Sequence, residues 1–398
     1  MRLKHSLALI IICISALFIA GCSEQNAAAL KNALKEAEEQ AQTEQPKETD
    51  PEDVIPETEA DDAAEPEEAL EPTDPDEAIA MTAAVAAQID EAAKNESDGY
   101  KYSEDGKRIV DLIMFMGQSN MAGAGGNAEY APKVPYDEGF EFRAVSDPTR
   151  LYPITEPFGV NENNLNAIMD LPGAKRGSLV SAFANTYFEE TGVPVVAVSA
   201  SAGATDTAFW MSDAVSYDFT ERLKRAIVWL ENDNYVIRHK YAVWLQGESD
   251  AVDNLSADQY EENMNTIIRP LFMNGIEKVF FITPGRTITR KDYFKNIINS
   301  QIKMSRESGY YALGTTVLSA ISAEYMVDEW HYNQTVLNLL GRECAKSVAY
   351  YTNLKKELCV YDYYNETTFI PDGFDYGGDV HVEPLNLDDC GLRKDVTN

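Results

Sequence analysis

Apolar and polar residues follow one another along most of the chain in a pattern that predicts alternating strands and helices. Mostly apolar runs, typical of strands buried on both faces, cover residues 109–116, where only Asp111 interrupts the run, and residues 193–199, 240–245, 278–283 and, more weakly, 312–318. Amphipathic segments with a helical period cover residues 178–190, 217–230, 256–272, 293–308 and 333–351. This alternation predicts an α/β fold, a three-layer α/β/α sandwich around a mostly parallel sheet. In such sheets, ligands bind at the carboxyl ends of the strands.

Two segments beside this pattern lack its periodicity. Residues 124–177 are rich in Pro, Asn, Asp and Gly, and are predicted to be a long loop insertion that shapes a binding cleft. The last residues, 356–398, are predicted to be an extension with a small closing β or loop segment. The domain that carries the α/β pattern is therefore expected to cover residues 101–355.

The first residues have the pattern of an export signal. Arg2 and Lys4 precede an apolar run over 7–20, and small residues stand directly before Cys22. Because the run is shorter than a bilayer-spanning helix requires, residues 1–22 are predicted to be a lipoprotein signal peptide with a lipobox. A lipid on Cys22 would anchor the mature protein to the outer face of a bacterial cell membrane.

Charge sets residues 23–100 apart from the rest of the chain. This segment holds 24 acidic and four basic residues, and its first aromatic residue is Tyr100. It cannot bury enough apolar surface to offset the entropy of ordering it, so we expect an acidic, disordered tether. The net charge of -33 also excludes nucleic acid as a partner, because a phosphate backbone would repel the protein.

The cysteines leave two alternatives open. The mature chain has Cys344, Cys359 and Cys390 besides Cys22. An exported protein can form a disulfide, for which Cys359 and Cys390 are the better pair, and three unpaired thiols are the alternative. Their spacing matches no zinc pattern, and the few histidines are scattered, so we expect neither a metal nor a cofactor.

A candidate nucleophile follows the first predicted strand. Ser119 stands where an open α/β sheet presents a reactive side chain, near a helix N-terminus that stabilises negative charge. A serine hydroxyl needs a general base, and His331 lies between the last strand and the last helix, at the same edge of the sheet. Asp328 can accept the imidazole Nδ1–H. Each segment alone fits a helix cap better than a catalytic site, but together they predict a catalytic triad.

Two further loops follow strands at this edge. Small residues surround Gly203, and the loop after the third strand contains Gln246 and Glu248. An oxyanion hole needs two or three preorganised donors. We expect the backbone N–H groups of Ser119 and Gly203 and the side-chain amide of Gln246 to form it.

Three motifs together resemble the sialate O-acetylesterase domain family, which is similar to carbohydrate esterase family six within the SGNH/GDSL hydrolases. They are Met-Gly-Gln-Ser-Asn-Met over 116–121, Trp-Leu-Gln-Gly-Glu-Ser-Asp over 244–250 and Asp-Glu-Trp-His over 328–331. The resemblance implies the same triad and the same oxyanion residues. Where the family usually has Gly-Gly-Thr-Ser, this chain has Gly-Ala-Thr-Asp over 203–206. The substrate-binding or orienting residues are expected to be Gln118, Asn120, Glu248 and Asp206.

The implied activity is hydrolysis of acetyl esters on carbohydrate, with acetylated sialic acid as the substrate. Acetylated xylan and cell-wall glycan are alternatives, because the sugar is bound by loops such as 124–177. A further alternative, of another class, is an inactive surface lipoprotein that only binds glycans. Release of acetate from an aryl acetate separates an esterase from such a binder.

Overall fold

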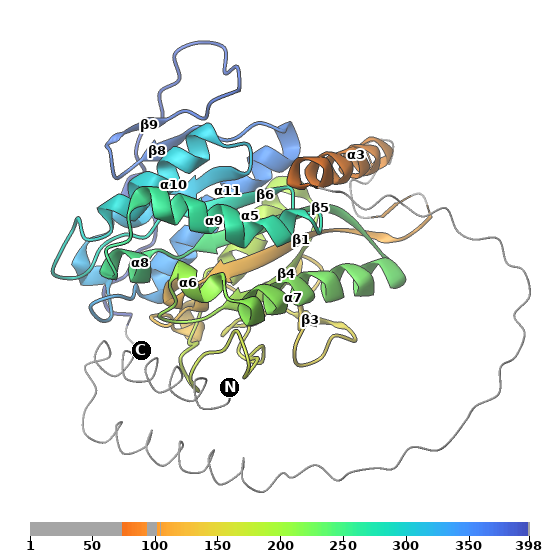
Figure 1. The fold of residues 1–398 in the computed structure, drawn as a ribbon, viewed down its shortest axis with the longest axis horizontal. Coiled ribbons are helices and arrows are strands. Elements are labelled where there is room, and N and C mark those ends of the chain that lie inside the picture. Colours follow the sequence, from red (N-terminus) through yellow and green to blue (C-terminus); the bar gives the residue numbers. More distant parts are fainter. Residues whose placement is uncertain (1–73, 94–101, 104, 397–398) are drawn as a thin grey trace, which may run out of the picture. The chain divides into compact units, whose positions relative to one another are not determined.

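The computed structural model describes residues 74–93, 102–103 and 105–396, and the predicted signal peptide and Cys22 lie outside them. Its main sheet has the strand order β3-β2-β4-β1-β5-β6-β7 (Figure 1). All neighbouring strands pair in parallel except β2 and β3. The strands are β1 (Arg108–Gly117), β2 (Gly139–Phe142), β3 (Leu151–Pro153), β4 (Val195–Ser201), β5 (Tyr235–Leu245), β6 (Lys278–Ile282) and β7 (Tyr311–Thr315).

Helices lie on both faces of this sheet, which confirms the predicted sandwich. The apolar clusters place α7, α9 and α10 on one face, and α5 and α11 on the other. Within the described residues, no helix is both long and apolar enough to cross a membrane. The helices are α3 (Pro75–Ala93), α4 (Ser119–Ala122), α5 (Val180–Thr191), α6 (Thr207–Trp210), α7 (Asp213–Asn232), α8 (Glu248–Val252), α9 (Ala257–Phe272), α10 (Lys295–Glu307) and α11 (Gln334–Leu354).

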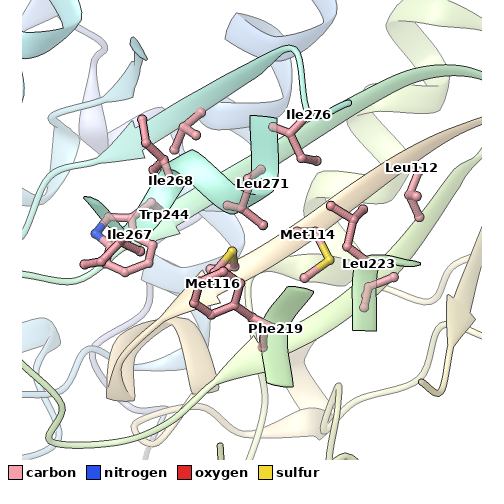
Figure 2. Packing of buried hydrophobic residues seen from close by; sticks show 14 of the residues in the cluster. Leu112, Met114, Met116, Phe219, Leu223, Trp244, Ile267, Ile268, Leu271 and Ile276 are labelled. Atoms are coloured by element: carbon pink, nitrogen blue, oxygen red, sulfur yellow. The ribbon is translucent and has the colours of Figure 1, made fainter. Parts of the chain in front are cut away.

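Strand β1 lies in the middle of the sheet and is buried on both faces. Its even-numbered side chains, such as Met114 and Met116, pack towards Phe219 of α7 and Leu271 of α9 (Figure 2). Its odd-numbered side chains, such as Phe115, pack towards α5 and α11. Because alternate side chains of a strand point to opposite faces, one continuous apolar run supplies both layers of the core. This packing fixes the end of β1, from which the candidate nucleophile projects.

The predicted tether is wrong over its last part, because residues 75–93 form helix α3. Ala78 and Ala86 of this helix are 2% and 0% exposed, and the Tyr310 hydroxyl donates to Asp76 at 2.7 Å. Alanine has the highest helix propensity, and its small side chain lets a helix lie close to its neighbours. Ile79 and Ile89 of the same helix also pack against apolar clusters of the domain. A few apolar residues on an alanine-rich helix are therefore enough to dock it.

The insertion and the C-terminal extension both contain strands. Within the insertion, β2 and β3 extend the sheet, and Phe140 and Phe142 of β2 are fully buried. In the extension, β8 (Val360–Asp362) and β9 (Thr367–Phe369) form the predicted small β segment. Of the two alternatives for the cysteines, the structure has the unpaired one: the free thiols are Cys344, Cys359 and Cys390.

Candidate active site

Three strand ends meet in register at the edge of the sheet where the candidate nucleophile lies. Gly117 of β1 pairs with Ser201 of β4 on one side and with Leu245 of β5 on the other. Ser119 and Gly203 each stand two residues beyond these aligned ends. Parallel strands therefore bring the predicted motifs together at the carboxyl edge of the sheet, where open α/β sheets bind ligands.

A tight exit from β1 holds Ser119 at this edge. Gly117 has a φ of +139°, and a Cβ there would lie 2.0 Å from the carbonyl oxygen of Leu245. Only glycine fits so close an approach of two backbones. Ser119 is half-buried and is the first residue of α4, as the sequence predicted.

His331 and Asp328 form the predicted pair. Nδ1 of His331 lies 2.8 Å from Oδ2 of Asp328, and Oδ1 accepts the backbone N–H groups of Trp330 and His331, both at 2.9 Å. Partial burial raises the pKa of Asp328, but the hydrogen bond and charge of His331 and the two backbone donors outweigh it, so the net pKa is lowered. Asp328 is thus held as a carboxylate that orients the imidazole.

Asn120 connects the segment of the serine with the segment of the histidine. Its Nδ2 donates to the carbonyl oxygen of Trp330 at 3.2 Å, and its Oδ1 accepts from the backbone N–H of Tyr332 at 3.4 Å. Its side chain therefore binds the residues on both sides of His331. A Cβ on Gly125, just after α4, would lie 2.8 Å from the His331 Cβ. Asn120 thus joins the segment of Ser119 to that of His331, and its predicted substrate-binding or orienting role stays a prediction.

Glu248 is a buried carboxylate beside this connection. Nδ2 of Asn120 donates to its Oε1 at 2.8 Å. Burial raises the pKa of Glu248, while the hydrogen bond from Asn120 and the charge of His331 lower it in part. The interaction with His331 means that Glu248 contributes negative charge to the surroundings of the imidazole.

Gln118, the residue before the serine, attaches the β1 exit to the loop after β5. It is buried, and its Oε1 accepts from the backbone N–H groups of Gly247 and Ser249, at 3.5 and 3.3 Å. This is an orienting contact between two of the three motifs.

The amide of Gln246, which the sequence predicted as an oxyanion donor, is turned to other acceptors in this structure. Its Nε2 donates to the carbonyl oxygen of Thr205 at 3.0 Å and to Asp250, which uses both hydrogens of the amide. Asp250 also accepts from the backbone N–H and the hydroxyl of Thr207, and burial raises its pKa. Gln246 and Asp250 thus form a buried polar network that holds the loop after β4 to the loop after β5.

Asp206, the departure from the family pattern, caps a helix. Its Oδ1 accepts from the backbone N–H of Phe209 at 2.7 Å at the start of α6. Burial is the largest cause of the raised pKa values of Asp250 and Asp253, and the negative charge of Asp206 also raises both values. The described contacts give Asp206 a structural role in this loop.

Gly203 has a partner that sequence reasoning missed. A Cβ on Gly203 would lie 3.7 Å from the Cβ of Ser119, so the two residues are neighbours. The Gly203 N–H donates to Oδ1 of Asp170 at 2.6 Å, and Oδ2 of Asp170 lies 3.1 Å from Nζ of Lys175. Burial lowers the pKa of Lys175, and Asp170 opposes this shift. Both residues come from the insertion, which has no motif or period that could have indicated them.

Comparison with known proteins adds a family to this geometry. The family model described as "carbohydrate esterase, sialic acid-specific acetylesterase" matches residues 109–350, more than half of the chain. The chain belongs to this family. The sialic acid-specific acetylesterase family comprises hydrolases of carbohydrate acetyl esters, so the chain is a carbohydrate acetylesterase by family, as the three motifs predicted. No curated protein sequence matches the chain.

Solved structures to which the chain is similar include esterases. A protein from Arabidopsis thaliana is 15% identical, with a TM-score of 0.41, and the match covers 59% of this chain and 96% of that one. A carbohydrate acetylesterase from Xanthomonas citri is 14% identical, with a TM-score of 0.39, and the match covers 63% of this chain and 58% of that one. A mutant acetyl-xylooligosaccharide esterase from Geobacillus is 11% identical, with a TM-score of 0.34, and the match covers 59% of this chain and 91% of that one. Among the described residues, no group of three or more His, Cys, Asp or Glu is arranged to hold a metal ion.

Proposed function

We propose that the protein is a serine acetylesterase that removes O-acetyl groups from carbohydrate through a triad of Ser119, His331 and Asp328. The 2.8 Å contact between Nδ1 of His331 and Oδ2 of Asp328 carries this proposal. It defines one ring nitrogen as the donor to the carboxylate, which leaves Nε2 as the base. Asn120 donates to the carbonyl oxygen of Trp330 and accepts from the backbone N–H of Tyr332, and these hydrogen bonds on both sides of His331 support the approach of this base to Ser119.

In the first half of the reaction, Nε2 of His331 takes the hydroxyl proton as Ser119 Oγ attacks the carbonyl carbon of the acetyl ester. The carbonyl oxygen becomes an oxyanion, and Asp328 stabilises the imidazolium that forms. When the intermediate collapses, His331 gives its proton to the sugar oxygen. The bond between that oxygen and the acyl carbon breaks, and an acetyl ester of Ser119 remains.

In the second half, His331 takes a proton from water, and the resulting hydroxide attacks the acetyl carbon. The second oxyanion collapses to acetic acid, which releases its proton to water to give acetate, and Ser119 regains its proton from the imidazolium. Both oxyanions need preorganised donors. We assign this role to the N–H groups of Ser119 and Gly203, and no longer to Gln246.

The substrate class that we propose is O-acetylated sialic acid. The match to the sialic acid-specific acetylesterase model supports it. The sugar would lie over the half-buried Ser119, beside the insertion that contributes Asp170 and Lys175 to this edge of the sheet.

We also propose that the chain is exported and anchored through a lipid on Cys22. The apolar run and the small residues before this cysteine support the proposal. The acidic residues that follow would hold the esterase away from the membrane by repelling one another.

The esterase proposal is tested by replacing the base. His331→Ala should lower the rate of acetate release from an aryl acetate by a factor of about 10³ or more, because triad members act as a unit. His381→Ala is the matched control, since His381 also pairs with a carboxylate, Glu383, at 2.8 Å, but on the exposed C-terminal extension. Equal rates for the two variants would refute the assignment.

A further inference from the structure

The loop insertion places a carboxylate on a backbone donor of the candidate oxyanion hole. The N–H of Gly203 donates to Oδ1 of Asp170 at 2.6 Å, a short hydrogen bond to a charged acceptor. An oxyanion on the substrate would need the same N–H. Because both acceptors are negatively charged, they cannot share it, and one must leave before the other binds.

The carboxylate also lies beside the nucleophile. A Cβ on Gly203 would be 3.1 Å from Oδ1 of Asp170 and 3.7 Å from the Cβ of Ser119. Gly203 thus stands between the two side chains. Whatever occupies its N–H lies at the reacting centre, so the contact bears on the chemical step of the reaction that we propose.

A second charge holds Asp170 from its other side. Oδ2 of Asp170 lies 3.1 Å from Nζ of Lys175, and the two side chains are only 6% and 5% exposed. Nζ of Lys175 also donates to the hydroxyl and the carbonyl oxygen of Ser201, at 2.8 and 3.1 Å. Lys175 is therefore fixed to the end of β4, and it would keep the Asp170 carboxylate paired after Gly203 had been released.

We propose that Asp170 is an internal competitor for the oxyanion hole, which the substrate displaces from Gly203 while Lys175 retains its charge. The inference rests on the proposed esterase function. Asp170 acts through Gly203 and is a positioning residue. Before the oxyanion forms, Asp170 occupies the N–H of Gly203, and only molecules in which Asp170 has released this N–H have a complete oxyanion hole. The rate of the chemical step is therefore reduced in proportion to the fraction of such molecules.

The test compares two substitutions of opposite expected sign. Asp170→Asn replaces the charged acceptor by a weaker neutral one, so kcat for an aryl acetate should rise by roughly threefold to tenfold while KM changes little. The inhibition constant of a phenylboronic acid, which forms a tetrahedral anion on serine, should fall by the same factor. Lys175→Met removes the other partner of Asp170, so kcat should fall. An unchanged or lower kcat in Asp170→Asn overturns the proposal.

A control separates competition from a loosened loop. Asp218 accepts from the backbone N–H of Ile168 at 3.1 Å, two residues before Asp170, and it pairs with Arg222. Asp218→Asn removes a buried carboxylate that holds the same loop but has no contact with Gly203 in the described structure. It should lower the melting temperature without raising kcat. A gain in kcat equal to that of Asp170→Asn would show that loop mobility is the cause, and would overturn the proposal.

A measurement on the unaltered protein does not depend on the folding of any variant. An alkyl fluorophosphonate would transfer its phosphonyl group to Ser119 Oγ and release fluoride, leaving a phosphoryl oxygen in the position of the oxyanion. A crystal structure of this adduct should show that oxygen on the Gly203 N–H, and Asp170 bound to Lys175 alone. An adduct with the Asp170–Gly203 contact intact overturns the competitor. Failure of Ser119 to react overturns the proposed function instead.

Discussion

Nδ2 of Asn120 lies 2.8 Å from Oε1 of Glu248, so the residue after Ser119 is bound to a buried acid. The same nitrogen donates to the carbonyl oxygen of Trp330. One amide group thus joins the loops that follow β1 and β5 to the segment of His331. Since the interaction of Glu248 with His331 lowers the pKa of the acid in part, the carboxylate stabilises positive charge on the imidazole.

Glu248→Gln should separate this charge from the geometry, because glutamine keeps the oxygen that accepts from Asn120. We expect kcat to fall by roughly threefold to tenfold, since the imidazolium formed in the transition state loses a nearby negative charge. The control is Glu129→Gln, which removes an exposed carboxylate and should leave kcat unchanged. A wild-type kcat for Glu248→Gln would show that its charge does not contribute to catalysis.

The same variant should have a distinct pH dependence of stability. Burial raises the pKa of Glu248 above 4.5, so its contribution to stability is fully present below that pH and is lost as the pH rises through the raised value. The melting temperature of Glu248→Gln should therefore increase relative to wild type between about pH 4 and 8. A difference that is constant across this range would contradict the assigned shift.

Asp328→Asn should disrupt the base while leaving the loop largely in place. Asparagine can still accept from the backbone N–H groups, but it lacks the negative charge that accepts Nδ1–H in the wild type, so kcat should fall by a factor of roughly 10² to 10⁴.

The same variant should respond differently to acid. The pKa of Asp328 is lowered from 3.8, so its contribution to stability is present above that pH and is lost as the pH falls through the lowered value. The variant should therefore be less sensitive than wild type to acid unfolding between about pH 4 and 2. Equal acid sensitivity would contradict this.

The sequence was sufficient for the central strands and their helices, and the exceptions have physical causes. Strand β5 begins at Tyr235, whereas the strand was predicted to begin at residue 240. The prediction was late because Arg238 and His239 interrupt the apolar run in the sequence. Both are buried in the structure: Arg238 pairs with Asp111 at 2.5 Å, and His239 contacts Glu277 at 3.1 Å. A periodicity argument cannot foresee charges that are satisfied by partners far along the chain.

The position of a residue after a strand was enough to predict which motifs lie at this edge of the sheet, but not how their side chains turn. The contact between Asp328 and His331 was predicted from position alone, and the catalytic roles of Ser119, Asp328 and His331 stay a proposal. The amide of Gln246 instead turns to Asp250, one helical turn later, and only the folded loop shows this. Asp170 lies in an aperiodic insertion, and its contact with Gly203 depends on how that insertion folds back over the sheet.

Helix α3 should stabilise the esterase domain without contributing to catalysis. A chain that begins at Asp74 retains the buried Ala78 and Ala86 and the hydrogen bond from Tyr310 to Asp76, whereas a chain that begins at Tyr102 loses them. We expect the shorter chain to melt several degrees lower, as loss of about 1 to 2 kcal/mol would give, with an unchanged kcat per folded molecule. Equal melting temperatures would show that α3 does not pack on the domain.

Lipidation is tested by fractionation of cells that express the full chain. Cys22→Ala should prevent the lipid from being attached, so that the esterase no longer remains with the membrane fraction and the mass of its N-terminal peptide lacks the acyl groups. Cys344→Ala is the control, because that thiol is buried in the core. If the same share of the esterase remained with the membranes in Cys22→Ala as in the wild type, the proposed anchor would be contradicted.

The central claim is tested most directly by acetate release from O-acetylated sialic acid, measured for the wild type and for Ser119→Ala. Acetylated xylan and cell-wall glycan serve as comparison substrates in the same assay. We predict that the wild type releases acetate fastest from the sialic acid ester, and that Ser119→Ala, with an unchanged circular dichroism spectrum, reduces release to background on every substrate. A folded Ser119→Ala variant with the rate of the wild type, or a wild type that releases acetate from none of these sugars, would contradict the account.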